Sequence, residues 1–205
     1  AISYILSFAR GTHELDASMK GGKWIKKKYV ALNEVSIGII GFGNIGRAIA
    51  KKMSAFGSKV YVNDIKDIND SNCINPNITV VTKEELLRRS DFISINCDLN
   101  TTSRGLIGYN ELSQVKRGAV LINTARGSIV NEGALVDALI DGKLAGAALD
   151  VYEREPLDPC SPLRSMSNVL LAPHNSNSSE LAWDRVHSNT INNLFIGLGL
   201  SERVA

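Results

Sequence analysis

The sequence predicts an α/β fold in which helices cover both faces of a parallel β-sheet. Short apolar segments rich in Val and Ile alternate with helical patterns along most of the 205 residues. Such alternation favours parallel strands, because each parallel crossover needs a connection as long as a helix. Hydrophobic residues make up 44% of the chain, which is enough for one large buried core.

An amphipathic helix opens the chain and ends at Gly21-Gly22. Its apolar positions, at helical spacing, are Ile2, Ile5, Leu6, Ala9, Leu15 and Met19. A strand follows at residues 35–40, where β-branched residues dominate. Residues 47–56 then form a helix that ends before Gly57, and residues 60–62 form the second strand.

The alternation continues to the end of the chain. Further strands are expected at residues 78–81, 92–95, 119–122, 145–149 and 169–171, and further helices at residues 83–89, 132–140 and 179–198. These elements predict three parts. Residues 1–22 form a linking helix, residues 23–175 form the sheet domain, and residues 176–205 carry a C-terminal helix.

Charge and cysteine content exclude several classes of protein. The 23 Lys and Arg against 21 Asp and Glu leave a net charge of +2, which is too small to predict nucleic acid or an anionic membrane as a partner. No apolar stretch reaches the roughly 18 to 20 residues that span a bilayer. Cys73, Cys97 and Cys160 are odd in number and widely spaced, which predicts neither disulfides nor a metal site and favours the reducing cytoplasm.

Gly41, Gly43 and Gly46 form a G-x-G-x-x-G pattern directly between a predicted strand and a predicted helix. This context is typical of a Rossmann-type dinucleotide site, because the helix N-terminus attracts the pyrophosphate. Gly41 would allow the tight turn, Gly43 the approach of the pyrophosphate, and Gly46 the packing of helix on strand. Asn44 and Ile45 complete the predicted cradle. The alternative is a turn with no ligand.

Asp64 ends the second strand, 18 residues after Gly46, near the offset of about 20 that is expected for a ribose-binding acid. Its carboxylate would accept hydrogen bonds from the adenosine ribose and repel a 2′-phosphate, which favours NAD over NADP. Lys66 lies two residues further on and would weaken that preference. The alternative for Asp64 is a simple turn residue.

Three segments of the second half carry further motifs: residues 122–127 (INTARG), 148–156 (ALDVYEREP) and 171–174 (LAPH). Together with the glycine pattern they resemble the D-isomer-specific 2-hydroxyacid dehydrogenase family, over nearly the whole chain to Leu198. The resemblance implies an NAD-dependent oxidoreductase that interconverts a D-2-hydroxy acid and its 2-keto acid. Reduction then needs a hydride, a proton for the alkoxide and a cation for the substrate carboxylate.

The resemblance implies that Arg126, Glu155 and His174 are catalytic. The fork of Arg126 would bind the carboxylate and polarise the keto oxygen. His174 would exchange the proton, since imidazole titrates near neutrality, and Glu155 would orient it. Each has a plainer interpretation: a surface cation for Arg126, a loop charge for Glu155 and a structural histidine for His174. His13 and His187 lie in predicted helices without a motif.

The resemblance also implies cofactor contacts from Cys97, Asp98, Thr124, Ala125 and Asp150, with Asp150 beside the nicotinamide. Two segments depart from the family pattern. Residues 96–99 (NCDL) replace a commoner proline-bearing version, so that Asp98 adds a negative charge near the cofactor path. Residues 175–179 (NSNSS) replace small residues and a Thr after the histidine. Cys97 is interpreted as a small buried side chain rather than a nucleophile.

By the same resemblance, most of a substrate domain would precede the first residue of this chain, so we expect these residues alone to bind NAD but turn over poorly. The apolar faces of the first and last helices would be exposed in a monomer, and we therefore expect a homodimer. Those faces carry Ile2, Ile5 and Leu6, and Leu194, Phe195 and Leu198. The alternatives are an NAD-responsive scaffold resembling corepressors and a Rossmann methyltransferase, which has no use for the three catalytic residues.

Overall fold

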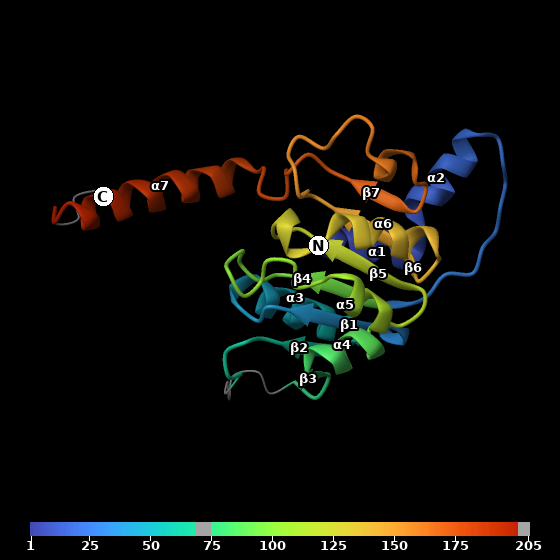
Figure 1. The fold of residues 1–205 in the computed structure, drawn as a ribbon, viewed down its shortest axis with the longest axis horizontal. Helices are drawn as coiled ribbons and strands as arrows, with labels where there is room; N and C mark the ends of the chain where they lie inside the picture. The colour runs from blue at the N-terminus through green and yellow to red at the C-terminus, as the bar shows by residue number, and fades with distance from the viewer. Residues whose placement is uncertain (69–74, 201–205) are drawn as a thin grey trace. The chain divides into compact units, whose positions relative to one another are not determined.

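The computed structural model describes residues 1–68 and 75–200 (Figure 1). The chain forms two compact units, the first running from Ala1 to Pro173 and the second beginning at His174. The first unit contains the sheet, and the second contains one long helix, α7 (Glu180–Gly197). Cys73 lies outside the described residues. Within the described residues no helix is both long and apolar enough to cross a membrane.

Seven parallel strands form one sheet in the order β3-β2-β1-β4-β5-β6-β7. In chain order the strands are β1 (Ser36–Ile40), β2 (Lys59–Asn63), β3 (Ile78–Val80), β4 (Phe92–Ile95), β5 (Ala119–Asn123), β6 (Leu144–Leu149) and β7 (Val169–Leu171). The order runs outward in both directions from β1 and β4, which is the doubly wound arrangement. The predicted fold class is therefore confirmed.

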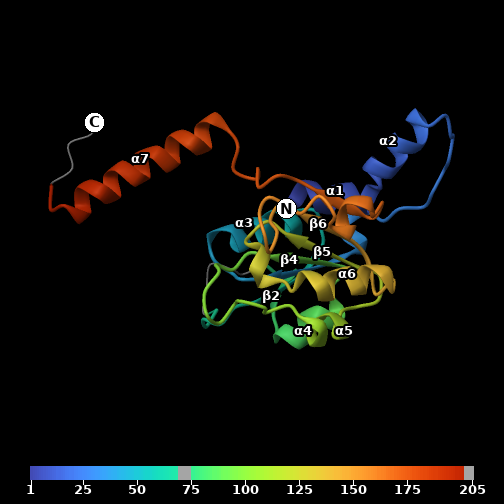
Figure 2. The same ribbon diagram turned by 45° about the horizontal axis from the view of Figure 1, so that its top comes forward.

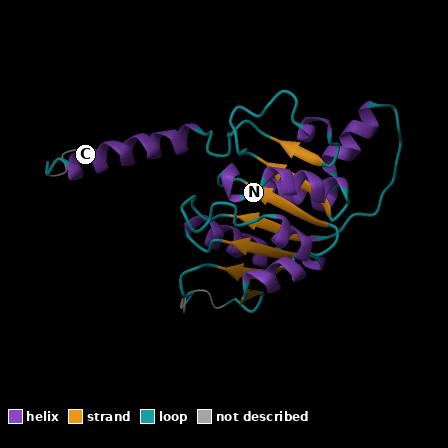
Figure 3. Cartoon of the chain, in the orientation of Figure 1, coloured by secondary structure: helices purple, strands orange, loops and turns teal. Residues whose placement is uncertain are grey.

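Helices cover both faces of this sheet (Figures 2 and 3). The helices of the first unit are α1 (Ile2–Arg10), α2 (Thr12–Lys20), α3 (Asn44–Ala55), α4 (Lys83–Arg89), α5 (Tyr109–Gln114) and α6 (Glu132–Ile140). Short 3₁₀ turns occupy Leu32–Glu34, Gly127–Ile129 and Pro162–Ser165. The buried side chains of α1 and α3 share one core cluster, and those of α4, α5 and α6 share the other.

Successive residues of a central strand supply opposite clusters, as the pleat of a strand requires. Ile39 belongs to the cluster beneath α1 and α3, and Ile40 belongs to the cluster beneath α4, α5 and α6. Because both faces are buried, the strands read as continuous apolar runs rather than as alternating patterns. This explains why residues 92–95, all four of which are buried, form a strand as their apolar content predicts.

The opening segment differs from the single helix that the spacing predicts. Gly11 has a left-handed φ of 57°, ends α1 and starts α2. The ring of Tyr29 packs where a Cβ of residue 11 would lie, 2.0 Å from the nearest ring atom. The expected exposure of the first helix is also wrong, because Ile5 is fully buried in the core cluster beneath α1 and α3. Helix α5 was not predicted, since only Leu112 of its six residues is buried.

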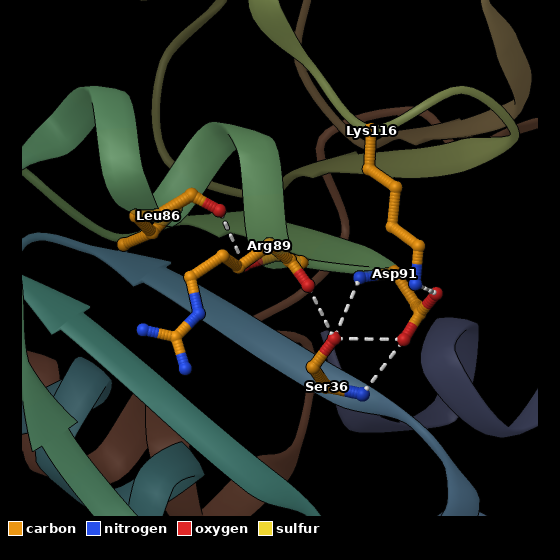
Figure 4. Close-up of polar contacts among 6 residues, drawn as sticks. Ser36, Leu86, Arg89, Asp91 and Lys116 are labelled. Atoms are coloured by element: carbon orange, nitrogen blue, oxygen red, sulfur yellow. Dashed lines mark hydrogen bonds and ion pairs between the residues drawn. The ribbon is translucent and has the colours of Figure 1, made fainter.

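A polar cluster joins β1 to β4 at the amino ends of the two strands (Figure 4). Asp91 precedes β4, and its carboxylate accepts hydrogen bonds from the N–H of Ser36 at 2.9 Å and from the Ser36 hydroxyl at 2.7 Å. Lys116, which follows α5, donates to the other carboxylate oxygen at 2.6 Å. The two central strands of the sheet are thus fastened together at their amino ends.

Burial alone would raise the pKa of Asp91, but its bonds to Lys116 and Ser36 outweigh burial and lower the pKa below the ordinary value. We therefore expect Asp91→Asn to lower the free energy of unfolding at pH 7 by about 1 to 2 kcal/mol, since the Lys116 bond is partly screened by solvent. A carboxyl with a lowered pKa stabilises the fold above its unfolded pKa of about 3.9 and loses that effect as pH falls through the folded value.

Urea unfolding at pH 7 and pH 3 measures this effect, and the difference between wild type and variant should shrink at the lower pH. Asp141→Asn, at the exposed end of α6, is the matched control and should leave stability unchanged. A difference between wild type and Asp91→Asn that is equal at both pH values would contradict the assigned role.

Candidate functional site

The strands β1 and β4 pair up to their last residues, Ile40 and Ile95, and the chain then leads from β1 to β2 on one side of the sheet and from β4 to β5 on the other. Open α/β sheets bind ligands in the crevice outside such a switch point. Here the glycine-rich turn follows β1, and an irregular loop from Asn96 follows β4. The crevice therefore lies between these two segments.

The three glycines of the turn have different surroundings. Gly41 has a φ of 91°, and a Cβ there would lie 2.5 Å from the backbone nitrogen of Cys97. A Cβ on Gly46 would lie 2.1 Å from the carbonyl oxygen of Gly41. A Cβ on Gly43, which caps α3, would meet no atom within 4 Å. Gly41 thus has the turn conformation, and Gly46 the close packing, that the sequence predicts. The space beside Gly43 is open for a ligand.

Asp64 holds the glycine-rich turn as well as facing the crevice. Its Oδ2 accepts a hydrogen bond from the backbone N–H of Phe42 at 2.6 Å, and its Oδ1 accepts one from the N–H of Lys66 at 2.9 Å. Each carboxylate oxygen retains a second lone pair for a further donor. The contact with Phe42 was not predicted, because Phe42 follows β1 and Asp64 follows β2, 22 residues later.

Two cavities lie along the carboxyl edge of the sheet. One of about 450 Å³ is lined by Gly41, Gly43 and Asp64, and one of about 380 Å³ by Ile45 and by Thr124, Ala125 and Arg126. Both are lined by Asn96, Cys97 and Asp98. Because they share three successive residues, the cavities adjoin at the switch point, where open α/β sheets bind dinucleotides. Of the predicted cofactor residues, Asn44, Gly46 and Asp150 line neither cavity.

Cys97 is half-buried between the two cavities, and its thiol is free, as is that of the exposed Cys160. Burial raises the pKa of Cys97, and the neighbouring carboxylates of Asp98 and Asp64 raise it further. The thiol therefore stays protonated near neutral pH, which agrees with its interpretation as a small packing side chain. Asp98 is exposed, and its carboxylate accepts a 3.4 Å hydrogen bond from the amide of Asn100.

Arg126 is placed by the residue that ends β5. Asn123 is buried, its Oδ1 accepts the N–H of Ala125 at 3.1 Å, and its Nδ2 donates to the carbonyl of Arg126 at 3.0 Å. These two bonds shape the turn from which the exposed Arg126 side chain lines the smaller cavity. Its guanidinium also donates to the carbonyl of Ala125 at 2.7 Å. The sequence did not identify Asn123, because an amide side chain at the end of a strand is the only indication of its role.

Asp150 and Glu155 follow β6. Asp150 is buried, and its N–H donates to the carbonyl of Asn123 at 3.0 Å. Burial raises the pKa of Tyr4, and the negative charge of Asp150 raises it further, so the carboxylate lies near that phenol. Glu155 is exposed, and its Oε1 accepts the N–H of Tyr152 at 3.1 Å. The place of Asp150 beside a nicotinamide stays a prediction.

His174 is the first residue of the second unit and has a φ of 53°. A left-handed conformation is uncommon for a residue other than glycine, although histidine adopts it more often than most, and residues held in it cluster at active sites. The structure brings Arg126 and Glu155 into neighbouring turns of the first unit. The approach of His174 to these two residues stays a prediction.

The fold, the glycine-rich turn and the adjoining cavities define a dinucleotide-binding domain. Residues 2–176 match the family described as D-isomer specific 2-hydroxyacid dehydrogenase, NAD binding domain, and the chain therefore belongs to this family. The resemblance carried by the four sequence motifs is confirmed, as is the assignment of NAD as the family's cofactor.

Relatives and solved structures agree with this membership. A glyoxylate reductase of Thermofilum pendens is 39% identical over 199 residues, which are 94% of this chain and 59% of the relative. The structure of a glyoxylate reductase from Paecilomyes thermophila has a TM-score of 0.85 at 32% identity, covering 100% of this chain and 62% of the other. An NAD-complexed 2-hydroxyacid dehydrogenase of Lactobacillus delbrueckii has a TM-score of 0.83 at 27% identity, covering 98% and 66%. The chain thus spans less than two thirds of these proteins.

The surroundings of the glycines predict that one substitution weakens cofactor binding while another lowers the stability of the fold. We expect Gly43→Ala to lower stability by no more than about 1 kcal/mol, since its Cβ meets nothing and alanine is only a poorer N-cap than glycine, but to weaken NADH binding at least tenfold by narrowing the pyrophosphate's approach. Gly46→Ala should instead lower stability, because its Cβ collides with the backbone of Gly41.

Thermal unfolding and titration of NADH fluorescence measure the two effects independently. Gly142→Ala is the control for glycine replacement as such, since it lies in a remote turn with open space around its Cβ position. Its φ of 63° predicts a small loss of stability without loss of NADH binding. Unchanged NADH affinity in Gly43→Ala would show that the pyrophosphate lies elsewhere.

Proposed function

We propose that the protein containing this domain is an NAD-dependent D-2-hydroxyacid dehydrogenase that reduces a small 2-keto acid, or oxidises the corresponding D-2-hydroxy acid. One observation carries the proposal. Arg126 lines the cavity that adjoins the cavity of Asp64 and the glycine-rich turn. A cation suited to a carboxylate therefore stands at the far end of the groove from the residue suited to ribose.

The proposed chemistry needs three groups from this chain. NAD, when bound, supplies or accepts the hydride. In reduction, the guanidinium of Arg126 binds the substrate carboxylate and draws electron density from the keto oxygen. The imidazolium of His174 gives its proton to that oxygen as the C2 carbon receives the hydride, and Glu155 holds the imidazole in the required tautomer. Oxidation reverses these transfers, with His174 accepting the proton.

Among the alternatives, nothing in the fold or the relatives favours a corepressor-like scaffold. The relative and the two solved structures described above are reductases or dehydrogenases by name. The methyltransferase alternative is excluded by membership of the dehydrogenase family.

We further propose that NAD is preferred over NADP. The carboxylate of Asp64 lies in the larger cavity, where it would accept hydrogen bonds from ribose hydroxyls and repel a 2′-phosphate. Lys66 and Arg47 line the same cavity and reduce this repulsion without removing the carboxylate. The expected result is a preference rather than complete exclusion of NADP.

The catalytic assignment predicts a loss of turnover without a loss of cofactor binding. In the full-length protein, Arg126→Lys should lower kcat/KM for the 2-keto acid by at least a hundredfold, since an ammonium cannot form the planar two-point contact with a carboxylate. His174→Asn should lower kcat similarly by removing the proton donor. Affinity for NADH should stay within about twofold in both variants, because neither side chain belongs to the glycine-rich turn.

Reduction of glyoxylate, hydroxypyruvate and 3-phosphohydroxypyruvate, each with NADH and with NADPH, measures these effects. Arg104→Lys serves as the control arginine, since it lies in the loop after β4 and lines neither cavity. Wild-type protein that binds NADH but reduces none of these acids, and no other 2-keto acid, would contradict the proposed function. The residues of this chain alone should bind NADH but reduce these 2-keto acids slowly.

We propose that the protein is a homodimer. Of the two helices expected to expose apolar side chains, the last one does, with Leu194 60% and Leu198 63% exposed. The apolar face of α1 is buried within the domain, but the segment around α2 exposes large apolar side chains, with Trp24 78% exposed. Met19, Ile25 and Val30 of the same segment are also exposed. Such a concentration of apolar side chains is typical of a surface that pairs with another protein surface. The two free described cysteines are compatible with a reducing compartment such as the cytoplasm.

The dimer predicts that Trp24→Ser combined with Ile25→Ser shifts the protein toward the monomer, because both changes remove apolar area from the same surface. Sedimentation velocity over a range of concentrations measures the shift. Ile65→Ser combined with Ile140→Ser is the control for exposed apolar residues elsewhere, and it should leave the dimer intact. A monomeric wild-type protein would end this part of the proposal.

A further inference from the structure

The turns that follow β5 and β6 are in direct backbone contact. Gly127 is the residue after Arg126, and it is buried against the peptide that joins Tyr152 to Glu153. A Cβ on Gly127 would lie 1.9 Å from the carbonyl carbon and oxygen of Tyr152. Any other residue at position 127 would therefore push the two turns apart.

Two glutamates link the same turns reciprocally. The N–H of Glu132 donates to Oε1 of Glu153 at 3.0 Å, and the N–H of Glu153 donates to Oε2 of Glu132 at 3.3 Å. Glu132 is the first residue of α6, so its N–H is one of the donors that a helix leaves without an internal partner. Each side chain thus satisfies the backbone of the other, across 21 residues of sequence.

The pair brings two negative charges together. Burial raises the pKa of Glu132, and the nearby carboxylate of Glu153 raises it further, although the bond from the Glu153 N–H opposes both effects. The positive N-terminal end of α6 offsets part of this repulsion. A glutamine at residue 132 or 153 would accept the same hydrogen bond without the repulsion between two carboxylates. Two glutamates are therefore not the most stable choice for linking these turns.

The turns joined by this pair are those that carry two of the proposed catalytic groups. Arg126 precedes Gly127, and Glu155 lies two residues after Glu153, with its carboxylate bound to the N–H of Tyr152. Asn123 adds a second link, since its carbonyl accepts the N–H of Asp150 while its side chain holds the Arg126 turn. A shift of either glutamate would therefore displace both catalytic turns.

We propose that Glu132 and Glu153 are positioning residues that keep Arg126 and Glu155 at a fixed separation, so that both act on one substrate. This inference rests on the proposed function. Neither glutamate lines the two cavities along the sheet edge. Their role therefore concerns the reacting end of the groove and not the binding of the dinucleotide.

The inference predicts a split between turnover and cofactor binding in the full-length protein. Glu153→Ala should lower kcat by about tenfold to a hundredfold, because small displacements of catalytic groups are costly, with KM for NADH within about twofold of wild type. Glu153→Gln should stay within about threefold of wild type, because its amide oxygen still accepts the N–H of Glu132. The double variant Glu132→Ala with Glu153→Ala should be no slower than the slower single variant.

Glu84→Ala is the matched control, since Glu84 also stands in the first turn of a helix but at the other end of the sheet. It should leave kcat unchanged. Equal losses in Glu153→Ala and Glu153→Gln, additive losses in the double variant, or a parallel rise of KM for NADH would each overturn the inference.

Amide hydrogen exchange separates this inference from the proposed function. In Glu153→Ala, residues 124–132 and 150–156 should exchange at least tenfold faster, while residues 41–46 keep the wild-type rate. If wild type turns over no 2-keto acid, the proposed function fails, and the positional role in catalysis fails with it. If wild type does turn over and the two segments exchange at unchanged rates in the variant, the inference alone is wrong.

Discussion

Gly41 lies against the backbone of Asn96 and Cys97 directly after the paired carboxyl ends of β1 and β4, and the rest of the site depends on that approach. The contact lets the chain leave β1 at a sharp angle, which starts α3 at Asn44 and leaves open space beside Gly43. It also places Asn96, Cys97 and Asp98 between the two cavities. A side chain at residue 41 would separate the turn from the loop after β4 and remove the shared wall.

The remaining site residues are held by hydrogen bonds between neighbouring strand ends. Asp64 at the end of β2 holds the turn after β1, and Asn123 at the end of β5 holds both its own turn and Asp150 after β6. At the opposite edge, Asp91 fastens β1 to β4. Because each turn is bonded to the next, the crevice is shaped by the sheet edge as a whole, which is a rigid support for catalytic groups.

Sequence patterns predicted the features that depend on residues close together in the chain. The left-handed conformation of Gly41 and the close packing at Gly46 agree with the structural roles that their spacing between a strand and a helix predicts, and residues 132–140 form the predicted helix. The break at Gly11 was missed because the reason for it, the Tyr29 ring, lies far along the chain. The Glu132–Glu153 pair was missed for the same reason, since two glutamates 21 residues apart carry no local signal.

Asp64 shows how one residue can couple cofactor choice to the shape of its site. The carboxylate that would repel a 2′-phosphate also accepts the N–H of Phe42 in the glycine-rich turn. Removing the side chain to admit NADP would therefore leave that N–H without its acceptor and loosen the pyrophosphate cradle. Asparagine would keep an acceptor for Phe42 while removing the charge. A substitution at residue 64 that changes cofactor preference must therefore keep a side-chain oxygen that accepts the Phe42 N–H. The negative charge of the carboxylate can be removed.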